Sequence, residues 1–348
     1  MKNLAILLKY FTFAPLVCLV PYLIMTKNIF IHLLVIVLLL VATGLDSSAQ
    51  RWKRQRYEAS FILGATNFMG ELGGANQIGT DYYKDFEIAM TRYCLGVGMR
   101  YKTTEFTALR GQLIYARLRG EDKLTQEPFR NNRNLMFRSP VIEFDITLEF
   151  SWMRESIASR YKVRRVKGRG QKGSEVYFYG FAGIGGMWFN PRGKLDGKYY
   201  SLRPLHTEGQ GLVDSRPNYS PFQIVIPWGV GVRYKVNKQM SIGMEYGFRH
   251  TFTDYIDDVS QTYYDKATLA NTYGKESSAL SDPALSPAFI KTDGTVTPDH
   301  ASPEGQGYGC QTCPNQQRGD PTDKDAYMFL NFSVNYRLKS SRKGLPKF

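Results

Sequence analysis

One short segment of the chain groups residues that could support chemistry. In "HTFTDYIDD", His250 is followed by Asp254, Asp257 and Asp258. A histidine beside carboxylates could act as a general acid or base, and a group of carboxylates could bind calcium. No nucleophile in a matching context accompanies them, and acidic clusters of this kind are usually just solvated. We therefore predict no catalytic residue and no metal site, and we expect the protein not to be an enzyme.

Two further motifs have simple structural explanations. Cys310 and Cys313 form a C-x-x-C motif in "GCQTCP", which a redox function would place before a helix, and Pro314 gives little sign of one. A zinc site would need two more ligands, so the motif indicates a local disulfide or two free thiols. The glycines of "AGIGG" at 182–186 have no helix after them, unlike a nucleotide fingerprint. We predict no cofactor.

The segment "EFDITLEFSW", residues 143–152, alternates polar and apolar side chains without a slip. This period of two places the apolar side chains on one face of a strand and the carboxylates on the other. In a transmembrane barrel the apolar face contacts lipid and the polar face fills the lumen. Buried acids there must be paired with cations. The predicted lumen ion pairs involve Glu143, Asp145, Glu149, Arg233, Glu245 and Arg249.

The same alternation occurs in eight segments, each long enough to span a bilayer as a tilted strand. Short turns, "KTTE" and "NKQ", alternate with long loops, the last of which covers 253–326. The sequence therefore predicts an all-β fold, an eight-stranded antiparallel transmembrane β-barrel of the outer-membrane type. The predicted strands are 57–66, 93–101, about 106–118, about 140–152, 176–189, 222–236, 240–252 and 327–338.

The segments outside the barrel have their own compositions. Residues 25–49 have the charged, apolar and small-residue regions of a secretory signal peptide, and we interpret 1–24 as an extension that precedes the biological start. The barrel is expected over 50–338, followed by a basic tail at 339–348. With an export signal and a barrel, the expected location is the cell outer membrane.

Positive charge concentrates at the predicted periplasmic rim. The connection at about 153–175 is long for an inner turn, and its part from Arg154 to Lys172 has a net charge of +7. The loop 253–326 has a net charge of −7. The rim could be solvated, could face anionic head groups, or could dock an acidic partner; nucleic acid is not expected. The candidate partner-binding residues are Arg160, Lys162, Arg164, Arg165, Lys167, Arg169 and Lys172.

Four segments of the chain resemble the PorG-like family of outer-membrane barrels of the type IX secretion system. They are "RYCLGVGMRYK" at 92–102, "ALRGQLIYARLRGED" at 108–122, "TDYIDDVSQTYYD" at 253–265 and "QRGDPTDKDAYMFLNFSVNYRL" at 317–338. The resemblance implies a non-enzymatic role in protein secretion, with the barrel docked to a periplasmic ring of PorK-like and PorN-like proteins, and no small-molecule substrate. The alternatives are a small barrel enzyme, such as a hydrolase or acyltransferase, and a passive OmpA-like or OmpW-like barrel.

Overall fold

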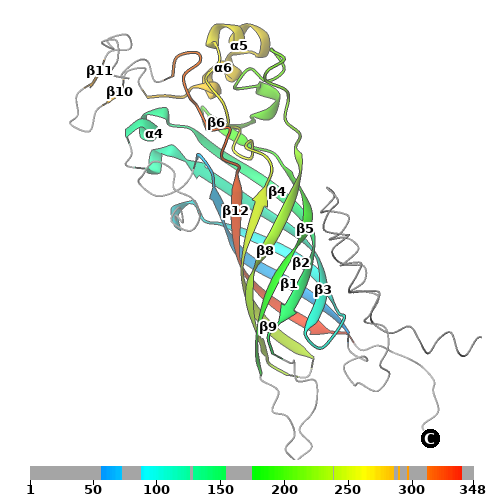
Figure 1. Cartoon of the computed structure of the whole chain (residues 1–348). Helices are drawn as coiled ribbons and strands as arrows, with labels where there is room; N and C mark the ends of the chain where they lie inside the picture. Colours follow the sequence, from blue (N-terminus) through cyan, green and yellow to red (C-terminus); the bar gives the residue numbers. More distant parts are fainter. Residues whose placement is uncertain are drawn as a thin grey trace, which may run out of the picture. The chain divides into compact units, whose positions relative to one another are not determined.

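Eight long strands form the main element of the structure (Figure 1). The computed structural model describes residues 56–72, 88–125, 128–153, 175–237, 239–285, 289–290, 296–297 and 312–338. By their internal contacts, residues 51–348 form one unit, and residues 1–50, including the predicted signal peptide, lie outside the described residues. The barrel strands are β1 (Tyr57–Met69), β2 (Arg92–Lys102), β3 (Thr107–Glu121), β4 (Met136–Ser151), β5 (Val176–Phe189), β8 (Phe222–Lys235), β9 (Met240–Thr251) and β12 (Ala326–Arg337).

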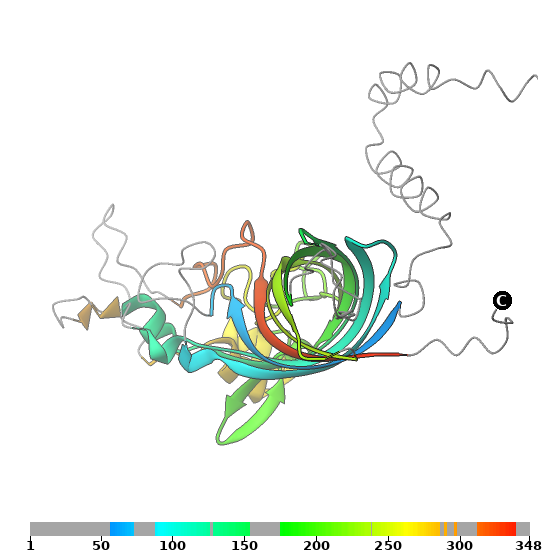
Figure 2. The same cartoon turned by 90° about the horizontal axis from the view of Figure 1, so that it is seen from below.

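The sheet closes on itself. The strands follow the order β3-β2-β1-β12-β9-β8-β5-β4, and β3 also pairs with β4, so that every barrel strand has two antiparallel neighbours. Figure 2 shows the strands curving round into this ring. Closure removes the free edges that a lipid environment would leave unsatisfied. The prediction of an eight-stranded antiparallel barrel is confirmed.

The two faces of the barrel wall have opposite chemistry. On β4, Phe144 and Leu148 are 55% and 53% exposed, whereas Glu143 and Thr147, which directly precede them, are 0% exposed. The same alternation continues around the barrel, with apolar side chains outward. Aromatic residues such as Tyr57, on the outer face, lie near the strand ends, as expected at the borders of a hydrocarbon layer.

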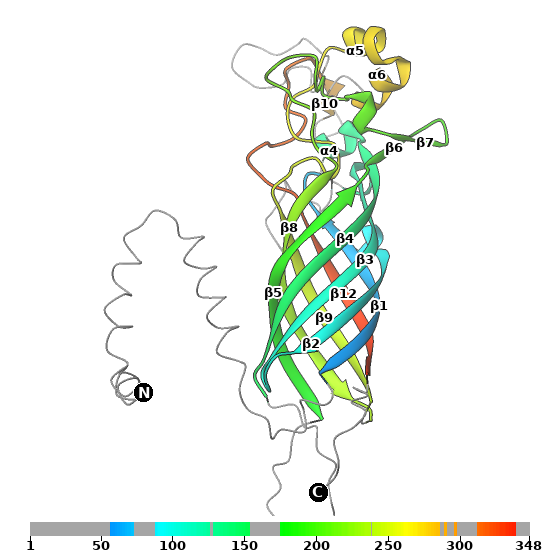
Figure 3. The same cartoon turned by 90° about the vertical axis from the view of Figure 1, so that its right-hand side faces the viewer.

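The two ends of the barrel differ in their connections, which we call the turn end and the loop end. At the turn end, β2 and β3 are joined by residues 103–106, where Thr103 N and Thr104 N both donate to Thr107 O at 3.1 Å. The β8–β9 turn at the same end is equally short. The connection between β4 and β5 also belongs to the turn end. The described parts of the connections after β1, β3, β5 and β9 gather at the loop end, above the barrel in Figure 3. Among the described residues, no helix combines the length and hydrophobicity needed to cross a membrane.

The loop end contains short elements that the sequence analysis did not predict. A hairpin extends the sheet beyond β4, because Arg192 pairs with Arg138. The connection 253–326, expected to be irregular, contains two helices and a small hairpin. The loop-end elements are η3 (Ile88–Met90), η4 (Asp122–Leu124), α4 (Pro128–Arg133), β6 (Arg192–Leu195), β7 (Lys198–Ser201), η5 (Arg203–Leu205), α5 (Lys266–Tyr273), α6 (Lys275–Ser281), β10 (Phe289–Ile290) and β11 (Val296–Thr297).

The apolar core lies in the loop-end half of the barrel and continues into the loops above it. Phe137 and Phe189, which face the barrel interior, belong to one buried cluster with the loop residues Leu72, Ile256 and Val259. This packing explains why β1, β3 and β4 run three to four residues beyond the predicted loop-end limits. There the strands are covered on both faces, so the alternation that marked them in the sequence fades.

Candidate functional site

Charged side chains cross the interior of the barrel near the turn end, and Glu149 is their centre. Its carboxylate contacts Arg100 Nε at 2.5 Å, Arg110 Nη1 at 3.2 Å and Arg233 Nη2 at 3.5 Å. These cations come from β2, β3 and β8, and all four side chains are buried. Of these partners, the sequence analysis named Arg233 as an ion-pair residue. Arg110 was missed, although its place on the inward face of β3 could have indicated it.

A second carboxylate, Glu58 on β1, lies closest to the turn end and was also missed. Its oxygens contact Arg100 Nη1 at 2.9 Å, Lys102 Nζ at 3.1 Å and Arg337 Nε at 2.7 Å. Because Arg100 contacts both Glu58 and Glu149, the two carboxylates belong to one network. We refer to these paired charges in the barrel interior as the lumen network.

The remaining predicted lumen residues lie further toward the loop end. Arg110 Nη1 and the Tyr179 hydroxyl both donate to Glu245 Oε1. Glu143 accepts from Arg249 Nε at 3.2 Å and from the Tyr327 hydroxyl at 2.5 Å. The ion pairs of the lumen network therefore link seven of the eight barrel strands through side chains that face each other across the interior.

Asp145 differs from the expectation of an ion pair with an arginine. Its Oδ2 accepts a hydrogen bond from Gln112 Nε2 at 2.8 Å, from the neighbouring strand β3. Arg249, the nearest cation of the predicted set, is directed to Glu143. A neutral amide thus contacts one oxygen of the carboxylate where the sequence pattern suggested a guanidinium, and Oδ1 is buried without a hydrogen-bond partner.

Packing in the turn-end half leaves little free space. A cavity between Arg100, Tyr179 and Arg233 measures about 10 Å³, which is the space that one water molecule needs. An eight-stranded barrel has an interior just wide enough for side chains to fill. The described residues of the interior therefore form a rigid, charge-paired plug of the barrel's own side chains.

At the loop end, the two segments that follow β9 and precede β12 pack against each other. Arg318 N donates to Gln261 O at 2.8 Å, and Arg318 Nη1 donates to Asp258 O at 2.6 Å and to Glu208 Oε1 at 2.8 Å. A Cβ added at Gly319 would lie 2.7 Å from Ser260 N. These are the segments 253–265 and 317–338 that carry part of the family resemblance, and they form one structural unit.

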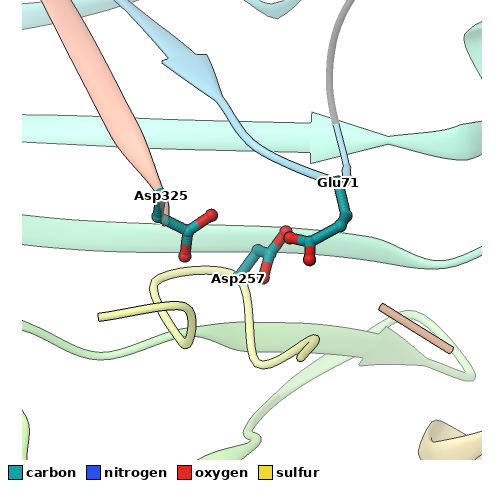
Figure 4. Close-up of side chains that lie close together, drawn as sticks. All are labelled: Glu71, Asp257 and Asp325. Atoms are coloured by element: carbon teal, nitrogen blue, oxygen red, sulfur yellow. The ribbon is translucent and has the colours of Figure 1, made fainter. Parts of the chain in front are cut away.

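Three carboxylates meet in this unit, and we call them the acidic cluster. Glu71 follows β1, Asp257 follows β9 and Asp325 directly precedes β12, and one oxygen of each lies within 4.8 Å of the others. Figure 4 shows the three side chains gathered between the strand ends. The strands β1, β12 and β9 are neighbours in the barrel, which brings residues far apart in sequence to one place.

Backbone amides hold the acidic cluster in position. Ile256 N donates to Asp325 Oδ2 at 2.8 Å, Leu72 N donates to Asp257 Oδ2 at 3.3 Å, and Asp320 N donates to Glu71 Oε1 at 2.9 Å. Burial and the carboxylate of Asp254 raise the pKa of Glu71 to about 8. Burial and the neighbouring acids also raise the pKa of Asp257 and of Asp325 well above the usual range. The ionised forms of these three acids are therefore electrostatically costly in this buried place.

The structure separates the residues that the sequence grouped around His250. His250 lies on the outward face of β9, where its ring is 5.5 Å from Phe252, while Asp254 and Asp257 are buried in the loop unit. Asp258 also leaves the group, because its carboxylate accepts from Thr207 and Tyr219 hydroxyls. His250 therefore does not lie beside these acids. The acids that lie beside Asp257 are Glu71 and Asp325, which the sequence analysis did not group with it.

Two sets of predicted site residues lie outside the described residues. The basic connection with Arg160, Lys162, Arg164, Arg165, Lys167, Arg169 and Lys172 belongs to 154–174, and Cys310 belongs to 298–311. Cys313 lies within the described segment 312–338. The partner-binding role of the basic residues and the disulfide between Cys310 and Cys313 therefore stay predictions.

Comparisons with known proteins find one matching family model, whose function is unknown, and several solved structures of β-barrels. Residues 31–163 match a family described as "Domain of unknown function (DUF6089)". No curated protein matches the sequence. Among solved structures, Neisserial surface protein A is 10% identical, covers 81% of this chain and 96% of its own, and has a TM-score of 0.33. OprG from Pseudomonas aeruginosa is 9% identical, with coverages of 82% and 97% and a TM-score of 0.34.

The Escherichia coli outer membrane protein W is 17% identical, with coverages of 82% and 98% and a TM-score of 0.29. At TM-scores of this size the similarities add nothing to the fold, which the strand pairings establish by themselves. The resemblance to the PorG-like family stays a sequence-based prediction. The chain is a closed, eight-stranded antiparallel β-barrel with an apolar outer wall, a charge-paired interior and a packed loop end. Its barrel fold is similar to that of outer-membrane barrels.

Proposed function

We propose that this protein is an outer-membrane β-barrel that serves as a fixed scaffold, and that it neither conducts solutes nor catalyses a reaction. The observation that carries the proposal is the combination of an apolar outer wall with a filled interior. The wall matches a hydrocarbon layer, and the arginines around Glu149 occupy the space that a channel would need. A barrel of this kind offers its two ends, rather than its lumen, for function.

The scaffold is tested by its location and by its conductance. We expect the protein to fractionate with the outer membrane and to shift in mobility on gels after heating, as folded barrels do. Reconstituted into planar bilayers, it is expected to give no stepwise conductance. Glu149→Ala together with Arg110→Ala opens the centre of the lumen network and serves as a positive control for detecting a channel. Stable unitary conductance from the unaltered protein would refute the scaffold.

The finer proposal is that the scaffold belongs to a protein-secretion machine of the type IX kind. Support comes from the sequence resemblance to PorG-like barrels, and from the fact that two of the segments that carry it, 253–265 and 317–338, make direct contact at the loop end. Such residues have a shared structural role that unrelated barrels would not need. On this proposal the partners at the turn end are PorK-like and PorN-like periplasmic ring proteins.

The docking surface proposed for the ring is the basic connection between β4 and β5. The turns at 103–106 and 236–239 show that this end of the barrel needs only short connections. The connection from Arg154 to Lys172 is much longer and has a net charge of +7. A surface of one sign attracts an acidic partner and speeds their encounter.

A deletion tests the docking surface. Residues 157–172 are replaced by a short Gly-Asn turn, and heat-dependent gel mobility is used to verify that the barrel still assembles. Loss of ring proteins from the purified complex, with loss of secretion, is the expected result. A matched control neutralises Lys194 and Lys198, which are exposed in the loop-end hairpin, and is expected to change neither. Normal ring binding and secretion after the deletion would show that this connection is not the docking surface and that the basic rim is simply solvated.

A further inference from the structure

We propose that Glu71, Asp257 and Asp325 form a binding site for a divalent cation of the calcium type at the loop end of the barrel. One oxygen of each carboxylate lies within 4.8 Å of the other two. Calcium binds oxygen at about 2.3 to 2.6 Å, so two oxygens on opposite sides of one ion lie about 5 Å apart. The three side chains are therefore close enough to share a single ion without moving the strands that carry them.

Unsatisfied oxygens point to a missing ligand. Asp325 is 1% exposed, its Oδ2 accepts from Ile256 N, and its Oδ1 is buried without a hydrogen-bond partner. Nearby, Asp254 is 3% exposed and neither of its carboxylate oxygens has a partner. A buried carboxylate oxygen without a partner is costly, and a cation bound in the acidic cluster would satisfy Asp325 Oδ1.

Two arginines near this place are already paired with other acids, and Lys324 Nζ donates to Pro321 O at 2.6 Å. Arg133 binds Asp122 with two hydrogen bonds, at 2.7 and 2.9 Å, and Arg318 binds Glu208 at 2.8 Å. Within the described part of the chain, no ion pair joins Glu71 or the aspartates around it to a Lys or Arg side chain. The acidic cluster thus lacks a fixed counter-ion, which distinguishes it from the ion-paired Glu58, Glu143 and Glu149 of the lumen network.

The donor set selects the kind of ion. All candidate ligands are carboxylate oxygens, which suit calcium and magnesium, and no histidine or cysteine is part of the cluster, as zinc would favour. A cavity of about 120 Å³, lined in part by Leu72, Asp257 and Arg318, adjoins the cluster. It has room for several water molecules, which could complete the six to eight oxygens of a calcium shell.

The position of the site gives it a structural role. Its ligands come from the loop-end limits of β1, β9 and β12, three neighbouring strands. A bound ion would join the segment after β1 to the unit formed by 253–265 and 317–325. The cation is therefore expected to stiffen the loop end, and this holds whether or not the barrel belongs to a secretion machine.

Calorimetry and chemical unfolding of the full-length barrel test the site directly. The protein is refolded in detergent, freed of cations with EDTA, and titrated with calcium chloride and, separately, with magnesium chloride. The expected result is one calcium site per chain, bound about tenfold or more tightly than magnesium, and a higher unfolding midpoint with calcium. Absence of binding heat and of any midpoint shift up to about 10 mM calcium, about tenfold above the weak end of extracellular sites, would overturn the proposal.

Isosteric variants separate a cation site from a structural acid. Asp325→Asn retains an oxygen that accepts from Ile256 N, and Asp257→Asn is its companion. Each is expected to weaken calcium binding about tenfold or more. In EDTA both variants should unfold at or above the midpoint of the unaltered protein, because a like charge has been removed. In calcium they should unfold below it.

Asp214→Asn is the matched control, since Asp214 is an exposed acid in another loop-end connection, and it should behave as the unaltered protein throughout. An equal loss of stability in EDTA and in calcium would show that Asp325 and Asp257 are structural acids, and would overturn the site. If a variant does not fold, the magnesium and calcium titrations of the unaltered protein still decide the question.

Discussion

Buried carboxylates occur in two regions of this barrel, and their surroundings differ. In the lumen network, Glu149 faces three arginines and Glu58 faces two arginines and a lysine. In the acidic cluster, Asp325 and Asp257 accept hydrogen bonds from backbone amides, and among the described residues neither forms an ion pair with a Lys or Arg side chain. A buried acid that pairs with a cationic side chain of the same protein contributes to packing. A group of buried acids without such a partner indicates a binding site for a cation.

The largest expected effect comes from breaking a pair in the lumen network. Arg249→Met leaves Glu143 with the Tyr327 hydroxyl as its remaining hydrogen-bond donor. We expect a loss of about 3 to 5 kcal/mol in the free energy of unfolding, because an uncompensated charge stays buried. The double variant Glu143→Met with Arg249→Met should lose less. Urea unfolding in lipid vesicles measures both, and a double variant that is as unstable as the single one would contradict the pairing.

The outer wall sets the next largest effect. Ile146 lies near the middle of the outward row that runs along β4 from Arg138 to Trp152. Ile146→Arg is expected to cost about 2 to 4 kcal/mol at the centre of the hydrocarbon layer, and Phe150→Arg, close to its border, about 0 to 1 kcal/mol. The same vesicle assay compares them. Equal costs at the two depths would mean that this face does not contact lipid.

A smaller effect is expected where the two loop-end segments meet. Gly319→Ala would place a Cβ 2.7 Å from Ser260 N, and backbone atoms there can yield only by moving apart. We expect a cost of about 1 to 3 kcal/mol and faster protease cleavage within 253–325, with the barrel strands still protected. Ser278→Ala, on α6, is a suitable control. Unchanged cleavage of the Gly319 variant would show that the contact contributes little to the loop end.

The smallest expected effect is an increase, rather than a decrease, in the free energy of unfolding, and it compares the acidic cluster directly with the lumen network. Asp254→Asn removes one charge beside the acidic cluster, and in EDTA it should raise the free energy of unfolding by on the order of 1 kcal/mol. The corresponding change in the lumen network, Glu143→Gln, should lower it, because Arg249 then loses its partner. If both substitutions destabilise the protein in EDTA, the two regions do not differ in charge balance.

The alternation of side chains predicted the barrel because successive residues of a strand face lipid and the packed, charged interior in turn. The pairing of Arg249 with Glu143 could not be predicted, because it depends on the register between the strands, which alternation alone does not determine. The acidic cluster was out of reach for another reason: its members depend on which strands become neighbours. Asp254 and Asp257 were noticed by spacing, but Glu71 joins them only because β1 pairs with β12.

The helices of the loop end could not be read from the sequence either. The helix α5 has almost no amphipathic pattern, and it is held by contacts from elsewhere, such as the stacking of Tyr273 on His206. In α6, Ser277 donates to Leu205 O at 2.5 Å. Elements fixed by tertiary contacts of this kind carry little local signal. The family resemblance pointed to 253–265 and 317–338, which lie outside both helices.

The pairing of β1 with β12 also has a consequence in time. A ribosome makes Glu58 long before Arg337, and the two side chains meet at 2.7 Å across the seam of the barrel. Until the last strand is inserted, the sheet has two open edges that would pair with any other strand, so the nascent barrel depends on a chaperone or an insertion machine during its transit. Asp325 arrives with that same strand, and the acidic cluster is complete only at closure. A cation could therefore bind at the acidic cluster only after β1 and β12 have paired. Its release is expected to weaken the pairing of β1 with β12 before any other strand pairing in the barrel wall.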